Sequence, residues 1–150
     1  MIQIESAQHP DADEIRVLVA RTITHSVTQD AALLADTIAN VGRNIDLWLA
    51  EPQRCLHLKA CAQGRIVGVV LVKDHWNLCS LFVAPESQGS GIGRALVEAA
   101  SAACAGRSPR SALLLNAATG AVGFYERLGF VARESTQVLP PGFKAMSRPV

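Results

Sequence analysis

Three closely spaced glycines, Gly89, Gly91 and Gly93, mark the part of this 150-residue chain whose residue types and spacing could do chemistry. They follow an apolar run at residues 81–83 that is typical of a buried strand, and Pro85 ends that strand because proline cannot donate to a sheet ladder. A helical pattern begins directly after the turn. Backbone N–H groups at the start of a helix are unsatisfied and lie at the positive end of its dipole, and glycines let an anion approach them. The segment therefore predicts a phosphate-binding turn.

The spacing of the glycines distinguishes between kinds of phosphate loop. A nucleotide P-loop needs a lysine followed by serine or threonine after its last glycine, whereas this chain has Arg94 and Ala95 there. The dinucleotide fingerprint G-x-G-x-x-G also fails, because the sixth position counted from Gly89 is Arg94. An ATP- or NAD-binding protein is therefore the weaker alternative. Arg94 would add a fixed positive charge to the first helical turn.

Two amphipathic helices are expected after a first strand at residues 1–6. Asp11 and Glu14 are spaced as a capping box at the start of the first helix. The second helix is expected to start at Asp30. Gly42 bends or ends it in one interpretation, and the pattern leaves open whether residues 47–49 continue it. The apolar stripes of the two helices comprise Ile15, Leu18, Val19, Ile23, Leu34, Ile38, Val41 and Ile45.

From Arg54 the apolar residues alternate, which predicts an antiparallel meander with strands at residues 54–61, 66–72 and 77–83. After the long helix, the wholly apolar run at residues 113–115 suits a strand that is buried on both faces and paired in parallel. A short helix is expected at residues 120–128, closed by Gly129 with positive φ. Residues 130–137 and 144–148 are expected to form the last two strands.

Two motifs in this chain resemble those of the GNAT superfamily, the acetyl-CoA-dependent N-acetyltransferases. Residues 88–93 follow a strand ending in Val-x-Pro-Glu and are similar to the family's Q-x-x-G-x-G pyrophosphate motif. Residues 124–130, Phe-Tyr-Glu-Arg-Leu-Gly-Phe, resemble its second conserved motif. The resemblance implies one α/β (α+β) GNAT domain over residues 1–150. Its sheet would be mixed, mostly antiparallel and six- to seven-stranded, with a splayed central parallel pair and helices on both faces.

The resemblance also implies direct transfer of an acetyl group from acetyl-CoA to an amine acceptor. Tyr125, the only tyrosine, would be the general acid that protonates the coenzyme sulfur, although a buried core aromatic is the alternative. The backbone of residues 81–83 would pair with the pantetheine arm, with the Val83 amide donating to the thioester oxygen. Phe124 suits either coenzyme contact or core packing. The implied coenzyme-binding residues are Leu81, Phe82, Val83, Gln88, Gly89, Ser90, Gly91, Ile92, Gly93, Arg94, Asn116 and Phe124.

The general base has no clear candidate in the sequence. Cys79 stands near the position where many family members carry a glutamate, and it suits a small core residue better than a nucleophile. His57 and His75 could remove the amine proton directly or through water, but a lone histidine more often has no catalytic duty. A chain of waters is the remaining route. The missing glutamate keeps a second interpretation open, a catalytically inactive GNAT-fold module that binds or senses acyl-CoA.

Composition narrows the class of protein further. A net charge of +1 disfavours nucleic acid or an anionic membrane as the main partner. The four cysteines lack metal-ligand spacing, so no metal site is expected. The first residues lack the pattern of a signal peptide, and the longest apolar run, residues 66–72, is too short to span a bilayer. We therefore expect a cytoplasmic enzyme whose acceptor the sequence leaves open, and the resemblance allows a homodimer.

Overall fold

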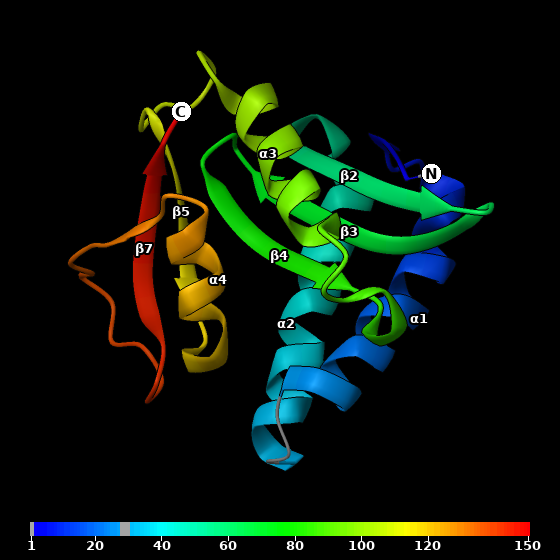
Figure 1. Ribbon diagram of the computed structural model, residues 1–150, viewed down its shortest axis with the longest axis horizontal. Helices are drawn as coiled ribbons and strands as arrows, with labels where there is room; N and C mark the ends of the chain where they lie inside the picture. The colour runs from blue at the N-terminus through cyan, green and yellow to red at the C-terminus, as the bar shows by residue number, and fades with distance from the viewer. Residues whose placement is uncertain (1, 28–30) are drawn as a thin grey trace.

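A seven-stranded sheet in the order β1-β2-β3-β4-β5-β7-β6 organises the computed structural model, which describes residues 2–27 and 31–150 (Figure 1). Every neighbouring pair is antiparallel except β4 and β5. The strands are β1 (Gln3–Ser6), β2 (Cys55–Ala62), β3 (Arg65–Lys73), β4 (Asn77–Val83), β5 (Ala112–Ala117), β6 (Val131–Ala132) and β7 (Lys144–Pro149). The helices are α1 (Ala12–Thr22), α2 (Ala31–Ala50), α3 (Ile92–Cys104) and α4 (Val122–Arg127). The predicted fold class is confirmed.

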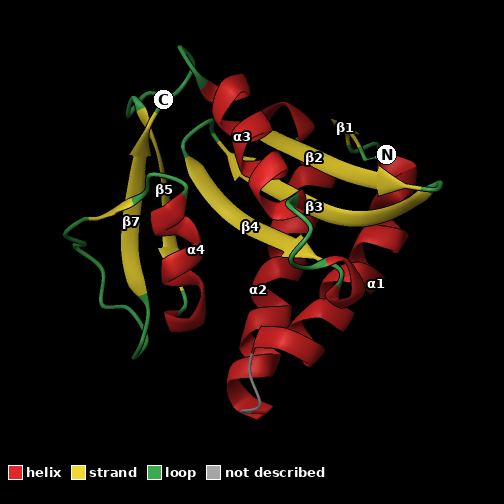
Figure 2. Ribbon diagram, in the orientation of Figure 1, coloured by secondary structure: helices red, strands yellow, loops and turns green. Residues whose placement is uncertain are grey.

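Helices cover both faces of the sheet, and each face has its own hydrophobic core (Figure 2). On one face, α1 and α2 bury residues that include Ile15, Val41 and Ile45 against β3. On the other face, α3 and α4 pack Leu96 and Tyr125 against the alternate residues of the strands. Burial of both faces explains why β3 and β4 are apolar along most of their length.

β4 and β5 form the predicted parallel pair, and they separate almost at once. Their register contains a single pair of residues, Asn77 with Leu114. Beyond this pair the two strands diverge, and Figure 1 shows them opening away from their joined end. The open side of β4 is therefore available to a ligand, because a sheet edge without a neighbour has unpaired N–H and C=O groups.

Several expected details differ in the structure. α2 is one uninterrupted helix, so Gly42 neither bends nor ends it and residues 47–49 continue it. Its expected start at Asp30 lies outside the described residues. The capping box at Asp11 and Glu14 is wrong: the Asp11 carboxylate accepts from the Gln8 N–H at 2.7 Å, and Glu14 accepts from the Ile66 N–H on β3 at 2.8 Å.

The final pair of strands is much less regular than expected. β7 is a full strand, but β6 contains only Val131 and Ala132 rather than residues 130–137. β6 lies at the edge of the sheet, and the chain that follows it has no layer against which to bury side chains. Val138, for example, is 101% exposed. Alternation of residue types could not predict this, because a strand also requires a neighbour and a face to cover.

Candidate active site

Residues 89–94, between β4 and α3, expose their backbone N–H groups. None of these amides donates to an acceptor in the part of the chain that the structure describes, and the first internal bond of the helix runs from the Ala95 N–H to the Gly91 carbonyl at 3.0 Å. Gly89 and Gly91 have φ values of +78° and +86°, which L side chains rarely adopt. The predicted turn is therefore present, with a row of free donors at the N-terminus of a 13-residue helix, and its binding of phosphate stays a prediction.

Contacts on either side of the turn hold it in place. The Gln88 side-chain amide donates to the Val83 carbonyl at 3.0 Å, and the Ser90 hydroxyl donates to the Ser87 carbonyl. Arg21, at the end of α1, binds both carboxylate oxygens of Glu86, at 2.7 and 3.1 Å. These hydrogen bonds to Arg21 lower the pKa of Glu86 to about 2. The side chains of Gln88, Ser90 and Glu86 thus shape the turn and leave its amides free.

The open edge of β4 presents backbone groups beside this turn. The Ala84 N–H donates to the carbonyl of Val67 in β3 at 2.8 Å. Because N–H directions alternate along a strand, the amides of Val83 and Leu81 face away from β3 and toward the gap beside β5. A ligand lying in this gap could therefore pair with β4 as an additional strand would.

A cleft of about 610 Å³ occupies the space where β4 and β5 separate. Its floor is made by β4 and β5, one wall by α2, and the opposite side by α4 and the loop before β7. Leu81, Phe82, Asn116 and Tyr125 line it among the residues predicted to take part. Val83 does not line it, and neither does the turn at residues 89–94. The structure thus places the two halves of the predicted site at successive positions along β4.

Tyr125 is held at the cleft by aromatic neighbours. Its ring meets Phe124 and Phe130 edge to face, with centroids 5.1 and 5.4 Å apart. The residue is 9% exposed and lines the cleft, and within the described residues its hydroxyl has no hydrogen-bond partner. Burial raises the pKa of the Tyr125 phenol to about 12, so it keeps its proton throughout the neutral range. A buried phenol that faces a cleft without a partner can donate to a ligand there.

Phe124 and Arg94 flank the phosphate-binding turn from different elements. A Cβ added to Gly93 would lie 3.2 Å from Phe124 Cζ, so this ring packs directly on the first turn of α3. Phe124 is part of the core on that face, which agrees with the packing alternative. Arg94 is exposed and belongs to no ion pair among the described residues. Its charge is therefore available beside the free amides.

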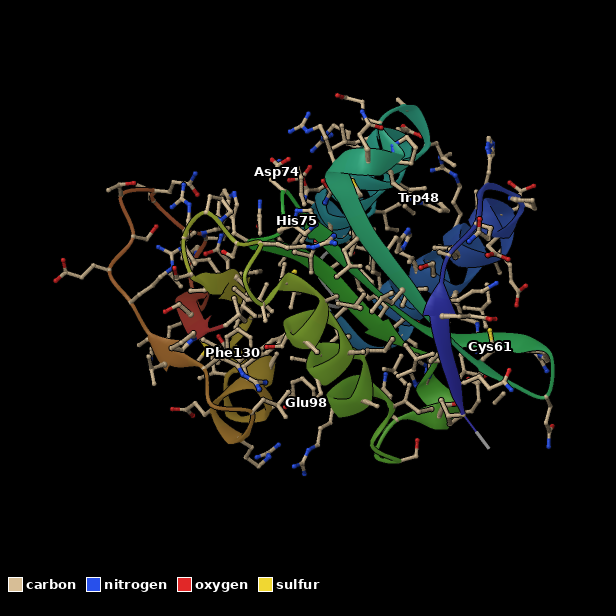
Figure 3. The ribbon with its side chains drawn as sticks, turned by 90° about the horizontal axis from the view of Figure 1, so that it is seen from above. Trp48, Cys61, Asp74, His75, Glu98 and Phe130 are labelled. Carbon is tan, nitrogen blue, oxygen red and sulfur yellow. The ribbon has the colours of Figure 1, made fainter. Side chains whose placement is uncertain are left out.

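The two histidines considered as bases lie outside the cleft. His57 is 5% exposed on β2 and packs edge to face on Trp48 of α2, with centroids 4.3 Å apart. Burial lowers the pKa of His57 to about 4, although the Asp11 charge opposes the shift. His75 lies beside Asp74 in the turn before β4, at the opposite end of that strand from the phosphate-binding turn (Figure 3). Neither histidine lines the cleft.

Cys79 does line the cleft, and its thiol donates to the Asn77 carbonyl at 3.4 Å. Burial raises the pKa of this thiol, which makes it a poor nucleophile at neutral pH. Three of the four cysteines are partly buried and Cys104 is fully buried, and all four are free thiols. In the described part of the chain, no group of three or more acidic, histidine or cysteine side chains could hold a metal ion.

Sequence reasoning did not single out the polar side chains with which α2 lines the cleft. Asp36, Asn40 and Asn44 recur every four residues and line the cleft, and Lys73, at the end of β3, lines it too. The periodic polar stripe was visible in the sequence, since residues four apart share one helix face. It could not be distinguished from an ordinary solvated face, because nothing in the sequence says which polar face meets a cleft.

The family model described as the acetyltransferase (GNAT) domain matches residues 43–140. The peptidyl-lysine N-acetyltransferase YjaB of Salmonella typhimurium is 27% identical over 142 residues, which cover 92% of this chain and 89% of YjaB.

Solved structures agree in fold over nearly the whole chain. A GCN5-related N-acetyltransferase from Rhodopseudomonas palustris superposes with a TM-score of 0.81 at 21% identity, covering 99% of this chain and 95% of that one. The PaiA N-acetyltransferase from Thermoplasma acidophilum, crystallised with coenzyme A, gives a TM-score of 0.78 at 16% identity, covering 100% and 99%. Within the described residues, no helix is both long and apolar enough to cross a membrane.

Proposed function

This chain belongs to the GNAT acetyltransferase family, and on that premise we propose that it acetylates an amine held in the cleft between α2 and the diverging strands β4 and β5. Membership makes it an acetyl-CoA-dependent N-acetyltransferase. The diphosphate of the coenzyme would accept hydrogen bonds from the free amides of residues 89–94, with Arg94 supplying an added positive charge. The pantetheine arm would then run along the open edge of β4 and bring the thioester to Leu81 and Tyr125.

The reaction needs one bond formed and one broken. The neutral amine attacks the thioester carbonyl carbon, and the new C–N bond forms as the carbonyl oxygen takes negative charge. The amide of Leu81 faces the gap and lines the cleft, so we assign it, rather than Val83, as the donor to that oxygen. When the C–S bond breaks, Tyr125 protonates the leaving thiolate, and the proton that the acetylated nitrogen loses returns to the phenol through solvent.

The amine must lose a proton before it attacks, and the cleft supports water as the acceptor of that proton. His57 and His75 lie elsewhere, and Cys79 has a raised pKa. Asp36 is the carboxylate among the lining residues, and it is exposed at the solvent end of α2. The rate of acetyl transfer should therefore rise with pH until the acceptor amine itself is neutral. The pH–rate profile should contain no step that comes from a histidine.

The observation that carries this proposal is the row of free amides at residues 89–94 beside a cleft that contains Tyr125. Calorimetry with acetyl-CoA, followed by thiol release in the presence of an amine panel, tests it directly. The panel should contain amino acids, small polyamines and a lysine-containing peptide, because the Salmonella relative is named for peptidyl-lysine. Saturable coenzyme binding with amine-dependent thiol release is expected. Absence of binding at millimolar coenzyme would contradict the proposal.

A second candidate is an acyl-CoA-binding module without turnover. Cys79 favours it, because this position lacks the carboxylate that the resemblance led us to expect. The same experiment separates the two candidates: tight coenzyme binding with no thiol release from any amine would support the binding module and exclude the enzyme.

A further inference from the structure

The cleft contains few charged side chains where the acceptor would bind. Among its lining residues, Lys73 is the single cation and Asp36 the single carboxylate, and neither belongs to an ion pair in the described structure. Amides and hydroxyls make up the remaining polar lining, from Asn40, Asn44, Asn77, Asn116, Thr37, Ser80 and Tyr125. A cleft of this composition has no acidic surface for a polycationic acceptor.

The charged residues around Lys73 are already paired with one another. Asp74, its neighbour in sequence, accepts two hydrogen bonds from Arg54, both at 3.1 Å. Glu51 also contacts Arg54, at 3.4 Å. Arg54 thus binds both carboxylates near this end of α2, and Lys73 forms an ion pair with neither of them.

The two unpaired charges lie at opposite ends of the α2 wall. Asp36, Asn40 and Asn44 follow one another at four-residue intervals, a span of about 12 Å along the helix axis. α2 leads through Pro52–Arg54 into β2, and Cys55 at the start of β2 is the register partner of Lys73. Lys73 therefore belongs to the end of the wall where Asn44 lies, and Asp36 to the other end.

We infer that Lys73 binds a carboxylate of the acceptor, so that the enzyme acetylates a small amine of the amino-acid class. Lys73 is half-buried, lines the cleft and forms no ion pair within the described residues, so its ammonium can bind a carboxylate of a ligand there. Leu81 lies four residues beyond Asn77, the register partner of Lys73, which is about 13 Å along β4. An amino acid or a dipeptide can bridge part of this distance, with its carboxylate at Lys73 and its amine toward the thioester. This inference depends on the proposed acetyl transfer.

The test compares three forms of each acceptor: the amino acid, its α-amide and the amine that lacks the carboxyl group. A lysine blocked as an N-acetylated α-amide represents a peptide side chain, and dipeptides represent a carboxylate farther from the amine. We expect kcat/KM to favour the acids over the amides by about tenfold or more, as a charge-assisted hydrogen bond provides. The Lys73→Met variant should reduce this preference to about threefold or less and raise the acceptor KM, with the KM for acetyl-CoA unchanged.

Lys144→Met is the matched control, because Lys144 is exposed on β7 and does not line the cleft. It should keep the full preference, and Lys73→Arg should restore part of it. If Lys73→Met does not fold, the wild type can be inhibited with carboxylic acids that lack the amine and with the corresponding amides. The acids should then be the stronger inhibitors. Amides and decarboxylated amines acetylated as well as the acids would overturn this inference alone. Absence of turnover with every amine would instead contradict the proposed function.

Discussion

Tyr125 has the two properties that are required of the acid that protonates the leaving thiolate: it retains its proton, and its position is fixed. Burial raises the pKa of its phenol to about 12, and the edges of Phe124 and Phe130 hold the ring. Because the hydroxyl has no partner in the described residues, a bound thioester sulfur would not have to displace one. The high pKa also means that activity should not decline through the mildly alkaline range on account of Tyr125.

Replacing Tyr125 with phenylalanine removes the proton donor and keeps the ring packing. We expect kcat to fall by about 100-fold, which is the lower range for loss of a general acid. The affinity for acetyl-CoA in calorimetry should change by less than about twofold, because the diphosphate contacts remain. An unchanged kcat at saturating substrates would assign Tyr125 to packing alone.

His57 should control stability in acid rather than catalysis. Its pKa is about 4 in the folded chain because of burial, against about 6.5 when exposed. The unfolded chain therefore binds more protons between these values, and stability is lost as pH falls from 6.5 toward 4. His57 alone should lower the free energy of unfolding by about 2 kcal/mol between pH 7.5 and pH 5.

The variant His57→Leu tests this assignment by urea unfolding at the two pH values. Leucine removes a buried Nδ1 that has no hydrogen-bond partner, so stability near pH 7.5 should change little. The pH dependence of the free energy of unfolding should shrink by about 2 kcal/mol relative to wild type. Acetyl transfer should be retained at neutral pH. An equal loss of stability between pH 7.5 and pH 5 in the wild type and in His57→Leu would show that other groups cause the loss.

Among the elements, the turn between β4 and α3 depends most on backbone conformation. Gly91 has φ +86° and no neighbouring atom within 4 Å of an added Cβ, so alanine there adds conformational strain without a clash. We expect Gly91→Ala to weaken acetyl-CoA binding by about tenfold, since strain of about 1–2 kcal/mol is relieved by moving the amides. Calorimetry measures this change.

Gly42→Ala is the control for adding a methyl group. Gly42 lies inside α2 and also has no atom within 4 Å of an added Cβ. Alanine there should raise the free energy of unfolding by about 1 kcal/mol and leave coenzyme affinity unchanged. Equal affinity in Gly91→Ala and Gly42→Ala would mean that the conformation of the turn does not matter for binding.

Prediction from sequence succeeded where one local pattern determines the structure. The turn at residues 89–94, the alternation of β2 and the positive φ of Gly129 were all expected and are present. It failed where partners distant in sequence decide the outcome. Glu14 contacts Ile66 rather than capping its own helix, and β6 shortens because it has no layer to cover. The polar residues that α2 contributes to the cleft were not singled out for the same reason.

At the scale of the whole molecule, the sheet is two sections joined at one end. The Leu114 N–H donates to the Trp76 carbonyl at 2.8 Å, and the Arg110 guanidinium stacks 3.9 Å from the centre of the Trp76 ring. These contacts and the single β4–β5 pair close one end of the gap, while the gap widens toward the other end, between α4 and α2 (Figure 1). A coenzyme that enters from the α3 side and an acceptor that lies against α2 could therefore meet within the sheet.

A crystal structure of the complex with coenzyme A is the measurement that tests this account most directly. The account predicts diphosphate oxygens within hydrogen-bond distance of the amides of residues 89–94, the pantetheine arm along Leu81 and Val83, and the sulfur beside the Tyr125 hydroxyl. Coenzyme bound elsewhere, or a sulfur out of reach of Tyr125, would contradict it.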